Sequence, residues 1–150
     1  MSYDSTNDTK NHQRRVRSLL WDAATEMNKR AELHDCSKLE SPEKELFDEF
    51  TPKLAGCTYG SDEYKEFLSG LNVALDHHYA NNPHHPEHYE NGINGFDLFD
   101  LIEMFFDWKA ASERHNDGNI FKSIEINTKR FNLSEQIVSI FRNTAERRQF

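Results

Sequence analysis

The chain has 150 residues, of which 36% are hydrophobic and 29% are charged, and its formal net charge is −8. This length suits a single domain, and the acidic charge disfavours binding to long nucleic acid, because contacts with phosphates need clustered Lys and Arg side chains. No apolar run approaches the roughly 18 residues that span a bilayer, and the N-terminus has no basic and apolar leader, so we expect a cytoplasmic protein without a membrane partner. The two cysteines, Cys36 and Cys57, have no CxxC spacing, which favours reduced thiols.

The periodicity of the apolar residues predicts helices throughout and no strand, so the expected fold class is all-α. Residues 1–8 are expected to be disordered, and residues 9–150 are expected to form one helical domain. A long first helix is predicted from Lys10 to about Arg30, and one of its faces is apolar. That face consists of Val16, Leu19, Leu20, Ala23, Ala24, Met27 and Ala31.

A second helix is expected to begin within SPEKELFDEF, where Ser41 can cap it and Pro42 suits its first turn. The segment LAGCTYG is predicted to be a turn. A third helix then runs from position 61 or 62 to near Tyr79. The residues that follow, NNPHHPEH, cannot continue this helix, because Pro83 and Pro86 lack an amide hydrogen and restrict the residues before them.

Three further helices are predicted, over residues 96–114, 120–131 and 134–148. The first of the three is apolar nearly all round, which places it in the middle of the protein. For the last one, Asn132 and Glu135 have the spacing of a capping box.

Histidines are concentrated in the last turn of the third helix and in the loop that follows it. Five of the eight lie within twelve residues: His77, His78, His84, His85 and His88. Imidazole is the commonest transition-metal ligand, and flanking prolines lower the entropy of presenting it, so this segment predicts a metal site. The alternative is a solvated turn in which histidine is merely polar. We favour His78 and His85 as ligands, because a rigid loop should present His84 and His85 in alternating directions and not to one metal.

The predicted central helix carries three carboxylates on one face, at steps of three and four residues: Asp100, Glu103 and Asp107. Residues 66–108 contain no Lys or Arg, so a cation or solvent must separate the acidic charges of this segment. Two interpretations remain open for the carboxylates. They could pair with Lys109 or with Arg114, which follows on the same stripe, or they could bind a metal together with the histidines.

The sequence HDCSK, residues 34–38, resembles the HDxGK-type signature of the HD superfamily of metal-dependent phosphohydrolases. That resemblance implies an HD-like fold and four ligands: a His on an early helix, the adjacent His and Asp, and an Asp on a later helix. The matching residues here are His12, His34, Asp35 and Asp107. His12 can join the set only if the first helix is interrupted, because a straight helix places it on the order of 30 Å from His34. Ser37 stands where the signature has Gly.

A closer resemblance covers nearly the whole chain, from about His12 to Thr144. The segments HDCSK, SPEKELF, HHYANNPHHPEHY and DLIEMFFDWKAASER together resemble the DUF5662 family of short bacterial and bacteriophage proteins. No activity is assigned to that family, so the resemblance implies membership and not a function.

The HD resemblance implies a metal-dependent phosphohydrolase that acts on a nucleotide or another small phosphate ester or diester through metal-activated water. One or two divalent ions per chain, Mn, Fe, Zn, Mg or Co, are expected to be bound by His34, Asp35, Asp107 and two or three of the loop histidines. Lys38 and Arg114 are candidates to hold substrate phosphate. Glu103 is a candidate to orient a ligand histidine.

Two other functions remain open. The same ligands could hold iron in an HD-type di-iron oxygenase, since imidazole and carboxylate suit iron as well as manganese. Alternatively, the cluster could bind a structural metal in a non-enzymatic module that acts by binding another protein. The sequence is also compatible with a homo-oligomer.

Overall fold

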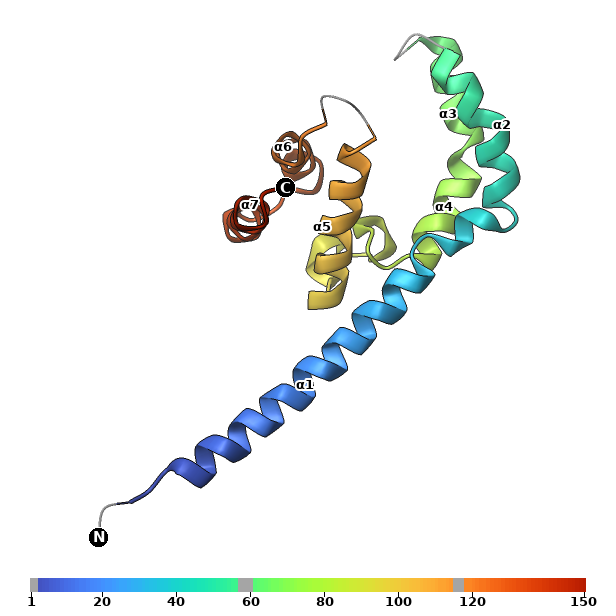
Figure 1. The fold of residues 1–150 in the computed structure, drawn as a ribbon. Helices are drawn as coiled ribbons and strands as arrows, with labels where there is room; N and C mark the ends of the chain where they lie inside the picture. Colours follow the sequence, from blue (N-terminus) through green and yellow to red (C-terminus); the bar gives the residue numbers. More distant parts are fainter. Residues whose placement is uncertain (1–2, 57–60, 115–117) are drawn as a thin grey trace. The chain divides into compact units, whose positions relative to one another are not determined.

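The computed structural model describes residues 3–56, 61–114 and 118–150 (Figure 1). All regular secondary structure in these ranges is helical, which confirms the predicted all-α fold. The chain divides into two units, Met1–His34 and Asp35–Phe150, and each is described by itself. Within the described ranges, every helix is too short or too polar to cross a bilayer.

The first unit consists of one helix, α1 (Thr6–Leu33), which Figure 1 shows without interruption. It begins before the predicted start at Lys10, so residues 6–8 are helical rather than disordered; residues 1–2 lie outside the described residues. His12 lies in this helix, and His34 follows directly after it, 22 positions further on. At 1.5 Å per residue, the two histidines are about 33 Å apart. The continuous helix therefore rules out a metal shared by His12 and His34, because the interruption that such a site requires is absent from α1.

The second unit begins with a short 3₁₀ helix, η1 (Cys36–Leu39), followed by α2 (Glu43–Gly56), α3 (Asp62–Gly70) and α4 (Asn72–Asn81). The helix α2 packs against η1, α3 and α4. The predicted turn LAGCTYG begins inside α2, and its last four residues, 57–60, lie outside the described residues.

The single helix predicted up to Tyr79 is instead two helices, α3 and α4, which meet at Leu71. Gly70 ends α3, and a Cβ atom on it would lie 2.4 Å from Cζ of Phe50, so only glycine allows this approach to α2. The amide of Leu71 donates to the carbonyl of Leu68, three residues back, which tightens and ends the helix. The close contact of Gly70 with Phe50 of α2 thus divides into two helices a segment whose apolar residues recur at helical spacing throughout.

The rest of the second unit holds the short helices η2 (Pro86–His88) and η3 (Gly92–Gly95) and the longer α5 (Leu98–Ser112), α6 (Ile120–Phe131) and α7 (Glu135–Arg148). The helix α6 packs against both α5 and α7. Between them lies the buried core: Met104, Phe105, Trp108, Ile120, Ile124, Leu133, Phe141 and Ala145. This core fixes α5, whose other side carries the acidic side chains.

The predicted capping box at Asn132 and Glu135 is wrong. Asn132 ends α6 in the left-handed conformation, with φ of 49°, which asparagine tolerates better than most residues. Ser134 caps α7 instead, and its hydroxyl accepts a hydrogen bond from the amide of Ile137 at 3.4 Å.

A candidate metal centre

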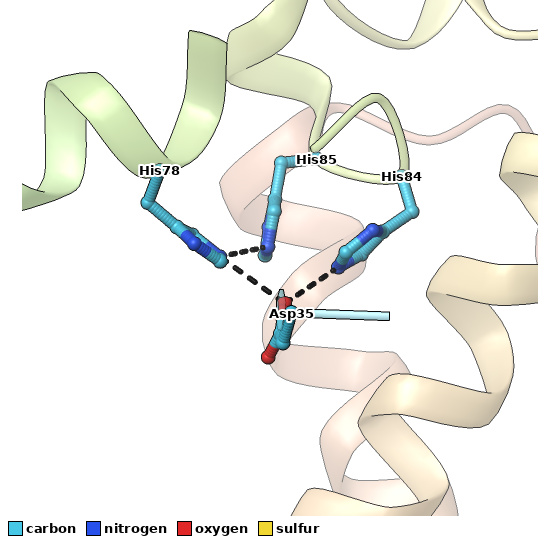
Figure 2. Close-up of side chains that lie close together, drawn as sticks. All are labelled: Asp35, His78, His84 and His85. Carbon is cyan, nitrogen blue, oxygen red and sulfur yellow. Dashed lines mark hydrogen bonds and ion pairs between the residues drawn. The ribbon is translucent and has the colours of Figure 1, made fainter. Parts of the chain in front are cut away.

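Four side chains of the second unit converge on one point, and each offers a ligand atom within 4.8 Å of the others: Asp35, His78, His84 and His85. Figure 2 shows the three imidazole rings directed toward the carboxylate of Asp35. Oδ1 of Asp35 lies 3.4 Å from Nε2 of His78 and 3.5 Å from Nε2 of His84. Nε2 of His85 lies 2.9 Å from Nε2 of His78. We call these four residues the His₃Asp cluster.

The backbone turns Asp35 toward the cluster. Asp35 has φ of 55° and ψ of 16°, a left-handed conformation that is uncommon outside glycine but is available to aspartate. It precedes η1, which brings Lys38 back over the carboxylate, so that Nζ of Lys38 lies 2.6 Å from Oδ2 of Asp35. One oxygen of Asp35 therefore faces the lysine, and the other faces the histidines.

The histidines come from the end of α4 and from the loop after it. His78 lies in the last turn of α4, and His84 and His85 follow Pro83. The prediction that these two neighbours point in alternating directions is wrong, because their ring centroids lie only 4.1 Å apart. The amide of His85 donates to the carbonyl of Asn82 at 3.2 Å, so the chain turns here; alternation holds only for an extended chain.

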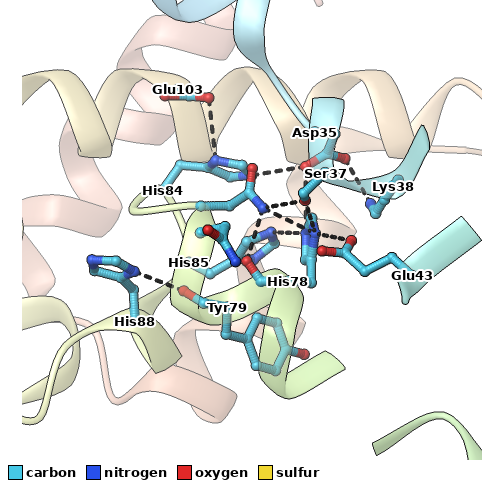
Figure 3. A network of polar contacts seen from close by, with 12 residues as sticks. Asp35, Ser37, Lys38, Glu43, His78, Tyr79, His84, His85, His88 and Glu103 are labelled. Carbon is cyan, nitrogen blue, oxygen red and sulfur yellow. Dashed lines mark hydrogen bonds and ion pairs between the residues drawn. The ribbon is translucent and has the colours of Figure 1, made fainter. Parts of the chain in front are cut away.

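Each of the two buried histidines contacts a glutamate through its second ring nitrogen (Figure 3). Nδ1 of His78 lies 2.9 Å from Oε2 of Glu43, and Nδ1 of His84 lies 3.2 Å from Oε1 of Glu103. A histidine that donates Nδ1–H to a carboxylate keeps an unprotonated Nε2, and this is the tautomer in which Nε2 binds a metal. In both histidines Nε2 is the nitrogen that faces the cluster.

Burial keeps two histidines of the cluster, His78 and His85, neutral. It lowers the pKa of His85 to about 3, and the neighbouring His84 and His78 act in the same direction. Burial also lowers the pKa of His78, assisted by the positive charge of Lys38 and opposed by Asp35 and Glu43. Neutral imidazole is the form that binds metal ions.

Glu43 is fully buried yet ionised. Burial alone would raise its pKa, but hydrogen bonds from His77, Ser37 and His78 outweigh that effect, so the pKa lies below its ordinary value. The carboxylate spans two histidines, since its second oxygen lies 2.7 Å from Nδ1 of His77. Glu43 therefore holds a negative charge directly behind the cluster.

The three carboxylates of α5 have three different surroundings. Glu103 contacts His84, as described above. A carboxylate oxygen of Asp107 lies within 4.8 Å of one of Asp35, which places Asp107 beside the cluster. Asp100 is buried and accepts hydrogen bonds from the hydroxyl of Tyr89 at 2.8 Å and from the amide of Asp97 at 3.1 Å, so it forms part of the helix cap.

Two residues predicted to belong to the site lie elsewhere in the second unit. His88 donates from Nδ1 to the carbonyl of Tyr79 at 2.7 Å and is outside the His₃Asp cluster. Arg114 follows the end of α5 and is exposed, so it does not continue the acidic stripe as predicted. The reason is that α5 ends at Ser112, where the helical periodicity that would align Arg114 with Asp107 stops.

His34 is the last residue of the first unit. It ends α1 with φ of −51° and ψ of 123°, so the chain leaves the helix at this residue. Its assignment as a ligand stays a prediction from the sequence HDCSK.

Sequence reasoning missed Glu43, Ser37 and Asn82. Glu43 occupies the first turn of α2, where an acidic residue is normally explained by the helix dipole. Ser37, which replaces the glycine of the HDxGK pattern, accepts a hydrogen bond from Nδ2 of Asn82 at 2.8 Å, and Asn82 also donates to the carbonyl of His78. The serine at position 37, where the HDxGK pattern has glycine, could have indicated this role, because a hydroxyl can form a side-chain hydrogen bond and glycine cannot.

Comparison with known proteins gives a family and no activity. A model described as "Family of unknown function (DUF5662)" matches residues 1–147. No curated protein matches the chain. No solved structure matches it.

Proposed function

The chain belongs to the DUF5662 family, whose function is unknown, and we propose that it is a metal-dependent phosphohydrolase centred on the His₃Asp cluster. The observation that carries this proposal is the convergence of three imidazoles and one carboxylate within 4.8 Å. The resemblance of HDCSK to the HD-superfamily signature supports the same reaction class. The proposed primary ligands share only Asp35 with the HD tetrad, because His78, His84 and His85 take the places of His12, His34 and Asp107.

The donor set fits a transition metal. Three imidazole nitrogens and one carboxylate oxygen suit Zn, Fe, Mn or Co, whereas Mg prefers oxygen ligands alone. Asp35 supplies one negative charge, and imidazole binds a metal in its neutral form, so the ligands offset only part of the charge of a divalent ion. Asp107, whose carboxylate lies beside that of Asp35, is the proposed ligand of a second ion.

Glu43 and Glu103 are positioning residues in this proposal. Each carboxylate accepts the Nδ1–H of a ligand histidine and so directs the lone pair of Nε2 into the site. Both are well shielded from solvent, Glu43 completely and Glu103 with 12% of its side chain exposed, which strengthens their interaction with the imidazoles.

The edge of the cluster reaches solvent, as a catalytic site requires. The side chain of Asp35 is 19% exposed and that of Lys38 is 38% exposed, while His78 and His84 are buried. A divalent ion held by Asp35, His78, His84 and His85 would supply acidified water and would polarise a phosphoryl oxygen. Lys38 holds Oδ2 of Asp35 and directs its remaining N–H groups toward an incoming phosphate, which favours a small phosphate ester or diester, such as a nucleotide, as the substrate.

The decisive experiment is elemental analysis of tag-free protein after loading with Zn, Mn, Fe or Co and removal of unbound metal. We expect about one ion or more per chain, since a site with four convergent ligands binds tightly. A double variant, Asp35→Ala with His84→Ala, is expected to retain less than about a tenth of that amount. His88→Ala is the matched control, because it removes a histidine of the same loop that lies outside the cluster. Equal metal content in the wild type and the double variant contradicts the proposal.

Activity then separates the hydrolase from the other functions. The loaded protein is screened for phosphate release from nucleotides, cyclic nucleotides and simple phosphate esters. Oxygen consumption by the iron-loaded protein without phosphate release indicates an oxygenase instead. Bound metal that no chelator or substrate displaces, with neither activity, indicates a structural site in a binding module.

A further inference from the structure

The helix α1 carries an apolar stripe that is exposed except at Ala23 and Met27, which are half-buried. None of its 28 residues, all of which lie in the described part of the chain, is buried. Val16, Leu19 and Leu20 have exposed fractions of 38%, 48% and 66%. Together with three smaller or more flexible residues they form one face of the helix at three- and four-residue steps: Val16, Leu19, Leu20, Ala23, Ala24 and Met27.

Such a face needs a covering surface. The helicity of a single helix in water depends mostly on packing of its apolar side, and exposed contiguous apolar residues mark an interaction site. The length of α1, about 42 Å at 1.5 Å per residue, suits a partner that is itself an extended helix.

The charges of α1 indicate which helix fits. Its N-terminal half holds one acidic residue, Asp8, and four basic residues: Lys10, Arg14, Arg15 and Arg17. Three acidic residues lie in the C-terminal half, next to Lys29 and Arg30: Asp22, Glu26 and Glu32. A parallel pair of such helices sets the four basic residues of each copy side by side, which is repulsive. An antiparallel pair places each basic half along a half in which acidic residues outnumber basic ones. In the register described below, Arg17 then faces the partner's Glu26 and Arg14 faces the partner's Lys29, so the antiparallel direction is the less repulsive one.

We propose that α1 forms an antiparallel two-helix interface with α1 of a second copy of the chain. The stripe from Val16 to Met27 is centred between Trp21 and Asp22, so a two-fold axis at that point places each apolar residue opposite another. Val16 then faces the partner's Met27, and Leu20 faces the partner's Ala23, in the spacing of coiled-coil core positions. This interface does not depend on the proposed metal chemistry.

The first test measures mass in solution by light scattering and sedimentation over a wide range of concentrations. The wild type is expected to be a dimer. Leu20→Glu buries a carboxylate in the proposed interface and is expected to weaken dimerisation about tenfold or more, toward the mass of a single chain. Ser18→Glu introduces the same charge on the opposite face of α1 and is expected to leave the dimer intact. A monomeric wild type, including one that binds anionic vesicles through α1, overturns the proposal, as does a dimer insensitive to Leu20→Glu.

The second test determines whether the two α1 helices pair in the antiparallel direction. It uses cysteine variants that keep the proposed interface intact. Val16→Cys and Met27→Cys are made separately in a chain whose Cys36 and Cys57 are replaced by Ala. In the antiparallel dimer, identical positions lie about 16 Å apart along the axis, too far for a disulfide, whereas Val16→Cys meets Met27→Cys. Only the mixture of the two variants is therefore expected to cross-link under mild oxidation. Cross-linking within either variant alone contradicts the antiparallel interface.

Discussion

Glu43 and His78 lie 2.9 Å apart, from Oε2 to Nδ1, and both side chains are almost completely buried. Because the carboxylate fixes the tautomer of the imidazole, Glu43→Gln is expected to lower metal affinity about 10- to 100-fold without removing a ligand. The measurement is a competition titration with a chelator of known affinity. Glu90→Gln, an exposed change of the same type, is the control, and an affinity unchanged by Glu43→Gln refutes the positioning role.

His84 and His85 are expected to contribute to the same metal site, since their rings lie 4.1 Å apart. Replacing either one with Ala should lower metal affinity. The double variant should lose less binding free energy than the sum of the two single losses, because both histidines bind the same ion. His12→Ala is expected to have no effect, as α1 separates His12 from His34. Strictly additive losses would instead indicate two independent sites.

The stability of the chelator-treated protein is expected to fall as the pH drops below about 6.5. The folded pKa of His85 is lowered to about 3, so between that value and 6.5 only the unfolded chain binds the proton, and protonation favours unfolding. One such histidine costs up to about 1.4 kcal/mol per pH unit, and the lowered pKa of His78 acts in the same direction. The lowered pKa of Glu43 adds a loss only below its ordinary value of 4.5.

Denaturant unfolding at pH 7.5 and pH 5.5 checks this dependence. The variant His85→Gln, which has no group that titrates in this range at that position, should show a smaller loss of stability between the two pH values than the wild type. An equal loss in both proteins would show that burial of His85 does not cause the dependence.

Lys38 is expected to bind phosphate next to the metal. In loaded protein, Lys38→Met should weaken the binding of inorganic phosphate roughly tenfold, because a hydrogen bond to a charged group is lost. Calorimetric titration with phosphate measures this. Lys44→Met, which changes an exposed lysine of α2, is the control, and metal content is measured in parallel because Lys38 also contacts Asp35. Unchanged phosphate affinity would limit Lys38 to a structural ion pair.

Asp100 is expected to affect stability and not metal binding. Its buried carboxylate accepts from Tyr89 and Asp97, and Asp100→Ala leaves these donors without their acceptor at a cost of about 1–3 kcal/mol. For a chain of this size we expect Tm to fall by several degrees, about 2–4 °C for each kcal/mol. Metal content should stay at the wild-type level, and a loss of metal in folded protein would show that Asp100 is a ligand.

The sequence was sufficient to locate most helices and the segments that build the site. Apolar residues at helical spacing predicted α6 and α7 to within one residue, because those helices bury a simple amphipathic face. The density of histidines between His77 and His88, and the adjacent His34 and Asp35, identified the segments that supply the His₃Asp cluster. These patterns involve residues that are close together in the sequence, so they can be recognised without knowledge of the fold.

Only the tertiary structure decided which side chains meet. The turn between Asn82 and His85 brings His84 and His85 to one point, and the uninterrupted α1 separates His12 from His34. Glu43, 35 positions before His78, approaches it because α2 packs against α4. Spacing along the chain determines contacts within one helix or turn, whereas contacts between elements depend on how those elements pack, and no local pattern records that packing.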